Sequence, residues 1–178
     1  MTRIHYFAYG SNLHPLRLKE RAPSAHAIGV IEAKGKKLTF SKRGSKDHSG
    51  KCNFYESNNP SDVVFGVLYE MDSSEKVALD SAEGKGFGYN EQTVCLEFDG
   101  KTYSSFTYIA DSRYIDESLR PYEWYKQFVI EGARYHSMPE KYISMLESIA
   151  AIPDPDSKRN GANMTRLSAM KKHTRRVK

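Results

Sequence analysis

Two short stretches of the sequence carry residues that can do chemistry together. The first is Tyr9-Gly10-Ser11-Asn12-Leu13, which follows an apolar run and precedes a helix expected to begin near His14 or Pro15. Main-chain N–H groups in such a strand-to-helix loop can point into one concavity, which suits an anion or an oxyanion. Taken alone, Gly10-Ser11-Asn12 is more often an ordinary turn.

The second stretch is Asp80-Ser81-Ala82-Glu83-Gly84, which leaves a carboxylate at the very end of a predicted helix. The helix dipole disfavours negative charge at that end, so Glu83 is poorly placed for stability and becomes a candidate for proton transfer. A solvent-exposed glutamate is the simpler alternative when this stretch is taken alone.

Other motifs fail on their spacing. The loop Gly44 to Cys52 has five residues between its glycines and a Cys after Lys51, so it does not match a phosphate-binding Walker loop. Gly84-x-Gly86-x-Gly88 follows a helix and lacks the dinucleotide-binding pattern. None of the six histidines falls in a metal-binding motif, so we predict no metal site.

The pattern of apolar residues predicts strands early in the chain and helices late. Strands are expected at residues 3–9, 27–31, 37–41, 63–71, 89–98 and 101–110. Helices are expected after Asp72, after Pro121 and after Ser137, with capping boxes at Asp72–Glu75 and Ser137–Glu140. This order predicts an α+β fold, with a mixed, curved, barrel-like sheet flanked by helices.

The positive charge of the chain is concentrated at its C-terminal end. Residues 157–178 hold eight basic side chains and no acidic one, so the remainder of this +5 chain carries −3. We therefore expect a globular domain over residues 1–156 and a solvated basic tail over 157–178. Met164, Leu167 and Met170 at threefold spacing also permit a short helix that docks on the domain. Charge confined to a tail does not indicate a nucleic-acid partner.

Cysteine content and hydropathy indicate the cellular compartment in which the protein resides. Cys52 and Cys95 are too few for a disulfide framework and lack the spacing of a zinc or redox site. No apolar run is long enough for a membrane span, and charged residues follow Met1 too soon for a signal peptide. We expect a cytoplasmic protein with no membrane association.

Taken together, these stretches resemble the γ-glutamylcyclotransferase family. The resemblance rests on several motifs in order, and it covers roughly residues 4–153. They are Tyr6-Phe7-Ala8-Tyr9-Gly10-Ser11-Asn12-Leu13, Val63-Val64-Phe65-Gly66-Val67, Leu79-Asp80-x-x-Glu83-Gly84, Tyr125 seven residues before Gly132-Ala133, and Met138-Pro139-Glu140-Lys141-Tyr142.

The resemblance implies an enzyme that cyclises a γ-glutamyl group to 5-oxoproline and needs no cofactor. Glu83 would be the acid/base, and Tyr125 would close the pocket. The segment lining the pocket and contacting the γ-glutamyl group would be Tyr6, Phe7, Ala8, Tyr9, Gly10, Ser11 and Asn12. Tyr89 and Tyr108 look like further pocket tyrosines. The implied partner is a small γ-glutamyl molecule, and a homodimer is left open.

Elementary chemistry agrees with these roles. The substrate's own α-amino group can attack its γ-carbonyl carbon, so no enzyme nucleophile is needed, and one carboxylate can take the amine proton and return it to the leaving group. The leaving group stays open between an amino acid, glutathione and other amines. Two rivals also stay open: a hydrolase that uses Ser11 or Cys52, and a non-catalytic binding module whose basic tail binds a polyanion.

Overall fold

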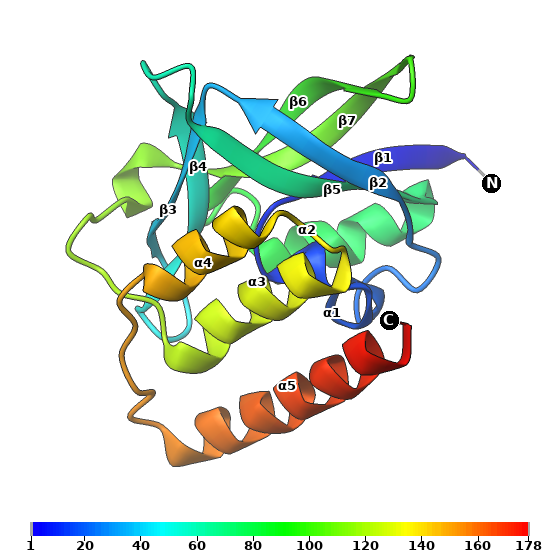
Figure 1. Cartoon of the computed structure of the whole chain (residues 1–178). Coiled ribbons are helices and arrows are strands. Elements are labelled where there is room, and N and C mark those ends of the chain that lie inside the picture. The colour runs from blue at the N-terminus through cyan, green and yellow to red at the C-terminus, as the bar shows by residue number, and fades with distance from the viewer. Residues whose placement is uncertain (1, 178) are drawn as a thin grey trace.

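The strands coincide with the runs of β-branched and aromatic residues, which favour extended backbone. The computed structural model describes residues 2–177, and seven strands lie within that range (Figure 1). They are β1 (Arg3–Ala8), β2 (His26–Lys34), β3 (Lys36–Arg43), β4 (Gly50–Glu56), β5 (Val63–Asp72), β6 (Tyr89–Phe98) and β7 (Lys101–Ala110).

Five of these strands form one mixed sheet in the order β2-β5-β1-β7-β6, in which β1 and β7 run parallel and the other neighbours antiparallel. β3 and β4 form a separate antiparallel pair. The Phe98 ring of the edge strand β6 lies so close to Gly29 of the opposite edge strand β2 that a Cβ there would be 2.2 Å from it. The sheet therefore curls toward a barrel but stays open, which confirms the predicted α+β fold with a curved sheet.

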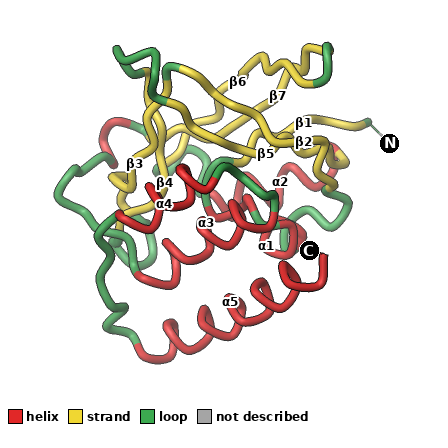
Figure 2. The backbone as a smooth tube through the Cα atoms, viewed as in Figure 1, coloured by secondary structure: helices red, strands yellow, loops and turns green. Residues whose placement is uncertain are grey.

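The α-helices formed by residues 2–177 lie on one side of the curved sheet (Figures 1 and 2). They are α1 (Pro15–Lys19), α2 (Lys76–Glu83), α3 (Glu123–Tyr135), α4 (Glu140–Ser148) and α5 (Ser157–Val177). Short 3-10 turns at Ser11–Leu13, Ser73–Glu75 and Ser112–Tyr114 each come soon after the end of a strand. Strands precede most helices along the chain, as expected for an α+β rather than a βαβ succession.

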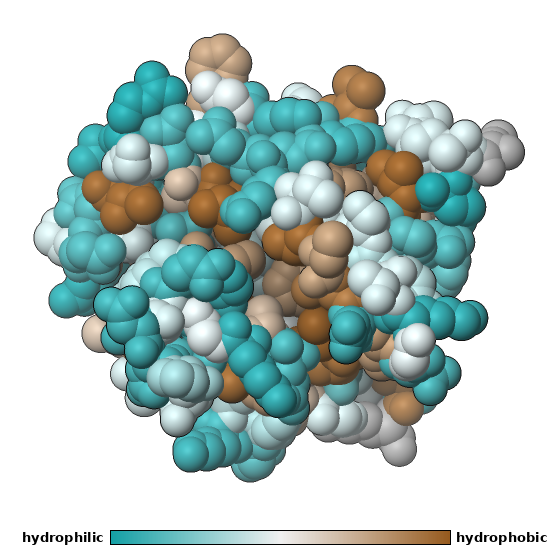
Figure 3. Space-filling model, turned by 90° about the horizontal axis from the view of Figure 1, so that it is seen from above, coloured by the Kyte–Doolittle hydropathy of each residue, from teal (hydrophilic) through white to brown (hydrophobic). Residues whose placement is uncertain are grey.

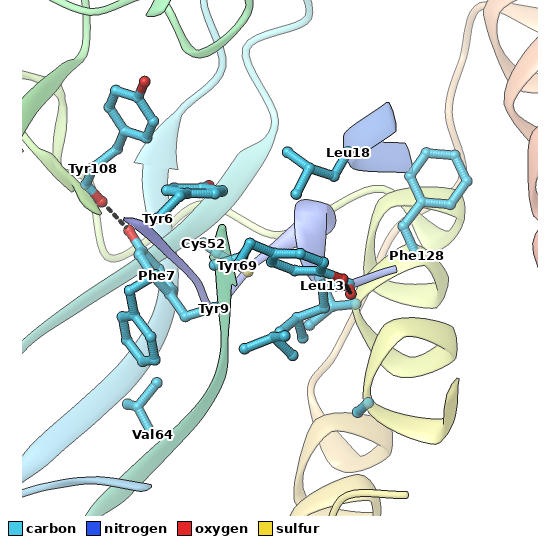
Figure 4. Packing of buried hydrophobic residues seen from close by; sticks show 14 of the residues in the cluster. Tyr6, Phe7, Tyr9, Leu13, Leu18, Cys52, Val64, Tyr69, Tyr108 and Phe128 are labelled. Carbon is cyan, nitrogen blue, oxygen red and sulfur yellow. Dashed lines mark hydrogen bonds between the residues drawn. The ribbon is translucent and has the colours of Figure 1, made fainter. Parts of the chain in front are cut away.

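The core anchors the loop after β1 against α3. Leu13 is fully buried, and its carbonyl oxygen accepts a hydrogen bond from the Tyr69 hydroxyl at 2.6 Å (Figure 4). The His136 ring nitrogen Nε2 lies 2.9 Å from the same oxygen. A Cβ at Gly132 of α3 would lie 2.4 Å from Leu13 Cβ, so the helix and the loop are in direct contact. The 10–13 segment is thereby fixed from two sides.

The C-terminal segment differs from the expected solvated tail. Residues 157–177 form α5, which packs against α3 and buries Leu167, Met170 and Thr174. The prediction of a solvated extension is wrong because these side chains, three to four positions apart, share one helical face. Met164, the first member of the predicted threefold pattern, is 48% exposed instead.

Both predicted capping boxes are wrong. The Asp72 side chain caps nothing, and the Glu75 carboxylate instead accepts hydrogen bonds from the main-chain N–H of Ser24 at 3.0 Å and from its hydroxyl at 2.6 Å. Ser137 has a φ of +52°, and no side chain caps α4. In each case a tertiary contact or a tight turn replaces the local motif.

The surface seen from the sheet side is mostly hydrophilic, with hydrophobic side chains gathered in patches between polar ones (Figure 3). Within residues 2–177, no helix combines the length and the apolar character that crossing a membrane requires.

Candidate functional site

The two stretches singled out from the sequence meet in space. Glu83 is the last residue of α2, where Gly84 in a left-handed conformation (φ +69°) ends the helix. Asn12 lies in the 3-10 turn after β1, and its amide Nδ2 donates a hydrogen bond to Glu83 Oε1 at 2.8 Å. The same nitrogen lies 3.2 Å from the Tyr6 hydroxyl. The Glu83 carboxylate is thus held next to the Gly10–Asn12 loop.

These residues line a small cavity, which we call the inner pocket. Seven of the nine residues predicted from the sequence line it: Tyr6, Tyr9, Gly10, Ser11, Asn12, Glu83 and Tyr125. Tyr89, Tyr108 and Cys52 complete the lining. The inner pocket therefore contains one carboxylate, one loop of main-chain donors and a wall of tyrosines.

Phe7 and Ala8, which we expected to line the pocket, lie outside it. Alternate side chains of a strand point to opposite faces, so Phe7 leaves the pocket side and packs over Gly66 in the core. Figure 4 places its ring toward Val64 and away from Tyr6. Ala8 is fully buried and does not reach the cavity.

The pocket tyrosines are fixed by main-chain hydrogen bonds. The Tyr9 hydroxyl donates to the carbonyl oxygen of Tyr108 (Figure 4), and the Tyr89 hydroxyl donates to the carbonyl oxygen of Cys52. The Tyr125 hydroxyl accepts from the Cys52 N–H at 3.1 Å. Burial raises the pKa of the Tyr9, Tyr89 and Tyr125 hydroxyls, so all three stay neutral at physiological pH.

Cys52 reaches the pocket on β4, a strand that the sequence analysis missed. Its side chain is 1% exposed, and burial raises the pKa of its thiol to about 12. A thiol with that pKa carries almost no thiolate at neutral pH and is a poor nucleophile. The alternation of Cys52 and Phe54 with polar residues was the one sequence signal for this strand.

A second, larger cavity opens beside the inner pocket and shares Ser11, Glu83, Tyr89 and Tyr125 with it. This outer cavity holds about 230 Å³. Its further lining is rich in cationic side chains, each from a different element or loop: Arg17, Arg21, Lys42, Lys46, Lys51 and Arg159. A molecule that enters the inner pocket must therefore leave its other end in a positively charged chamber.

The site has little capacity for a metal ion. Across the described chain, no group of three or more His, Cys, Asp or Glu side chains is arranged to hold one. What the geometry offers is a single carboxylate able to move a proton, next to donors able to stabilise an oxyanion.

Comparison with known proteins decides the family. The γ-glutamylcyclotransferase of Bos taurus is 34% identical to this chain over 151 residues, which cover 81% of this chain and 77% of the relative. The chain belongs to the γ-glutamylcyclotransferase family. The Homo sapiens γ-glutamylcyclotransferase is 32% identical over the same shares of both chains.

Structural comparison agrees with this membership in the γ-glutamylcyclotransferase family. A solved γ-glutamyl cyclotransferase superposes with a TM-score of 0.82 at 28% identity, covering 94% of this chain and 99% of the other. The model of the AIG2-like family matches residues 63–146, the segment that contains Glu83 and Tyr125. The resemblance found in the sequence is thereby confirmed.

Proposed function

We propose that this chain is a γ-glutamylcyclotransferase that converts a γ-glutamyl amino acid or amine into 5-oxoproline and the free amine, with Glu83 as the acid/base. The observation that carries the proposal is the 2.8 Å contact that holds the Glu83 carboxylate beside the Gly10–Asn12 loop in one pocket. Homologues that share this fold are named for the same activity.

The reaction needs one proton carrier and no enzyme nucleophile. The substrate's α-amino nitrogen attacks the γ-carbonyl carbon, and a new C–N bond closes the five-membered ring. Glu83 takes a proton from that nitrogen as it attacks. The tetrahedral intermediate then collapses, the original amide C–N bond breaks, and Glu83 returns the proton to the departing nitrogen.

The neighbours of Glu83 have supporting roles. A main-chain N–H of the Gly10–Asn12 loop donates to the oxygen that becomes negative in the intermediate, which is worth about 3 kcal/mol in comparable sites. The inner pocket holds about 20 Å³, on the order of one water molecule. A γ-glutamyl group is larger than that, so it enters only when some of the lining side chains move apart.

The hydrolase alternative lacks an activated nucleophile. The raised pKa of Cys52, about 12, keeps the thiol protonated. No described histidine lies in the inner pocket to deprotonate Ser11 or Cys52. Both facts favour intramolecular attack by the substrate's own amine.

The proposal includes a small-molecule γ-glutamyl partner, no cofactor and no nucleic acid. A cytoplasmic location is supported by two cysteines, Cys52 and Cys95, that are both unpaired. A homodimer stays a prediction, which light scattering on the purified protein tests.

Incubation with γ-glutamyl-alanine, glutathione and ε-(γ-glutamyl)lysine, followed by mass spectrometry of 5-oxoproline, tests the proposal. We expect 5-oxoproline and the free amine in equal amounts from at least one of them. Glutamate in place of 5-oxoproline would support the hydrolase. Absence of any product would favour the non-catalytic module.

A further inference from the structure

Lys42 is a largely buried lysine beside the outer cavity. It lies near the end of β3, and only 4% of the residue is exposed. Its ammonium makes no hydrogen bond or ion pair to any residue from 2 to 177, although Nζ sits 4.4 Å from the centre of the Tyr89 ring. The side-chain stem is buried while Nζ keeps access to the outer cavity, so an anionic ligand there can pair with the ammonium.

The chain makes specific room for this side chain. Gly88 has a φ of +132°, and a Cβ there would lie 2.8 Å from Lys42 Nζ. A side chain at position 88 would therefore be strained and would also displace the ammonium. The Lys42 side chain lines the outer cavity beside Tyr89 and Glu83, so its charge is directed to the space next to the proposed acid/base.

Most other charges of the outer cavity are already neutralised by a partner. Lys51 pairs with Asp47 at 2.7 Å, Arg17 with Glu20 at 3.0 Å, and Arg159 with Asp154 at 2.5 Å. The lining cations with no carboxylate within 4 Å, among the residues described, are Arg21, Lys42 and Lys46. Glu83 is the one lining carboxylate that has no cation at that distance in the same set. The cavity therefore carries a surplus of two positive charges.

We propose that Lys42, together with Arg21 and Lys46, forms a leaving-group subsite that selects γ-glutamyl compounds whose leaving amino acid carries two carboxylates. The inference rests on the proposed function. The γ-glutamyl group brings one ammonium and one carboxylate, which cancel, so the surplus of two positive charges faces the leaving group. A dicarboxylic amino acid neutralises that surplus, a monocarboxylic one leaves half of it, and a simple amine leaves all of it.

A charge series on the unmodified protein tests the selectivity without any mutation. The three substrates are γ-glutamyl-glutamate, γ-glutamyl-glutamine and γ-glutamyl-glutamine amide, whose leaving groups have nearly the same shape and carry two, one and no carboxylates. We expect kcat/KM to fall roughly 10-fold or more at each step, because a charge-assisted hydrogen bond contributes that much. The steps should shrink as salt concentration rises.

Substitution of Lys42 tests whether this side chain causes the charge selectivity. In Lys42→Met we expect the ratio of kcat/KM for γ-glutamyl-glutamate to kcat/KM for the uncharged substrate to fall roughly 10- to 100-fold. Lys37→Met, an exposed lysine on the same strand but outside the cavity, is the matched control and should leave the series unchanged. Lys46→Gln removes a charge from an exposed loop position without touching the core.

The outcomes separate the two claims. Equal kcat/KM along the series, or a Lys42→Met variant that keeps the full preference for γ-glutamyl-glutamate, would overturn the subsite. If circular dichroism shows that Lys42→Met does not fold, the subsite is tested by the substrate charge series on the unmodified protein and on Lys46→Gln. Turnover of γ-glutamyl-alanine but of none of the three series substrates would overturn the subsite alone, whereas turnover of no γ-glutamyl compound would overturn the proposed function itself.

Discussion

The side-chain amide of Asn12 donates a hydrogen bond to the carboxylate of Glu83 at 2.8 Å, although 71 positions separate the two residues in the chain. This contact joins the loop after β1 to the C-terminal end of α2. It also fixes Oε1 of the carboxylate, and Glu83 lines both the inner pocket and the outer cavity.

Asn12→Ala should impair turnover more than stability. Without the amide, the Glu83 carboxylate loses its fixed orientation, and we expect kcat for 5-oxoproline formation to fall roughly 10- to 100-fold, as for the loss of an orienting hydrogen bond in other sites. Steady-state kinetics measure the change. Asn58→Ala, on an exposed loop, is the control. An unchanged kcat in Asn12→Ala would mean that the amide does not orient the acid/base.

Cys52→Ala should keep the activity. Because burial holds the thiol protonated, with a pKa of about 12, we expect turnover within a fewfold of the parent. Native protein should react with one equivalent of a thiol reagent, at the exposed Cys95, and denatured protein with two. A loss of activity as large as that expected for Glu83→Gln would revive the cysteine hydrolase.

Folding stability should fall in mild acid because of His14. This residue is fully buried, and burial lowers the pKa of its ring from 6.5 to about 4. The neutral ring is thus favoured in the folded state. The contribution of the neutral His14 ring to folding stability is fully present above pH 6.5 and is lost as the pH falls through about 4. Between pH 7.5 and pH 5 the free energy of unfolding should drop by about 2 kcal/mol from this group.

Urea unfolding of His14→Asn at the two pH values checks this assignment. His14 Nδ1 accepts from the Leu16 N–H at the start of α1, and Asn can replace that cap without titrating. The pH dependence should shrink in this variant and persist in His48→Asn, an exposed control whose positive φ Asn tolerates. An equal pH dependence in His14→Asn would place the effect elsewhere.

Helix α5 should contribute to the stability of the whole domain. Leu167 is 3% exposed on the face that packs toward α3, so Leu167→Ala should cost about 2 to 4 kcal/mol. Met164→Ala, on an exposed part of the same helix, should cost less than about 1 kcal/mol. Equal and small effects in urea unfolding would show that the helix does not share the core.

Much of the site could be predicted from the sequence because its parts are local. The run before Gly10 predicts a strand, Gly10-Ser11-Asn12 predicts a loop, and a carboxylate before Gly84 marks a helix end. Each feature lies within a few residues, where strand alternation and helix termination are readable. The family resemblance then indicated that the two parts belong together, and the structure places them in one pocket.

The rest depends on contacts between distant segments. Tyr89 and Lys42 meet only because the Gly84–Gly88 loop folds against β3, and nothing near Lys42 in the sequence distinguishes it from a surface lysine. Strand β4 was not predicted because it follows the polar loop around residue 47 directly and mixes polar with apolar residues. Likewise, α5 is a highly basic segment with few apolar residues. These residues are enough to dock the helix only because α3 presents a complementary surface to them.

The central claim is that the Glu83 carboxylate moves the proton, and single-turnover formation of 5-oxoproline by Glu83→Gln measures it most directly. Gln keeps the size of the side chain and its hydrogen-bonding capacity but cannot take up the proton. We predict that the ring-closure rate falls roughly 100- to 10,000-fold while circular dichroism and urea unfolding stay close to the parent. Glu97→Gln, exposed on β6, should keep the parent rate. A Glu83→Gln protein that still forms 5-oxoproline at the parent rate would contradict the account.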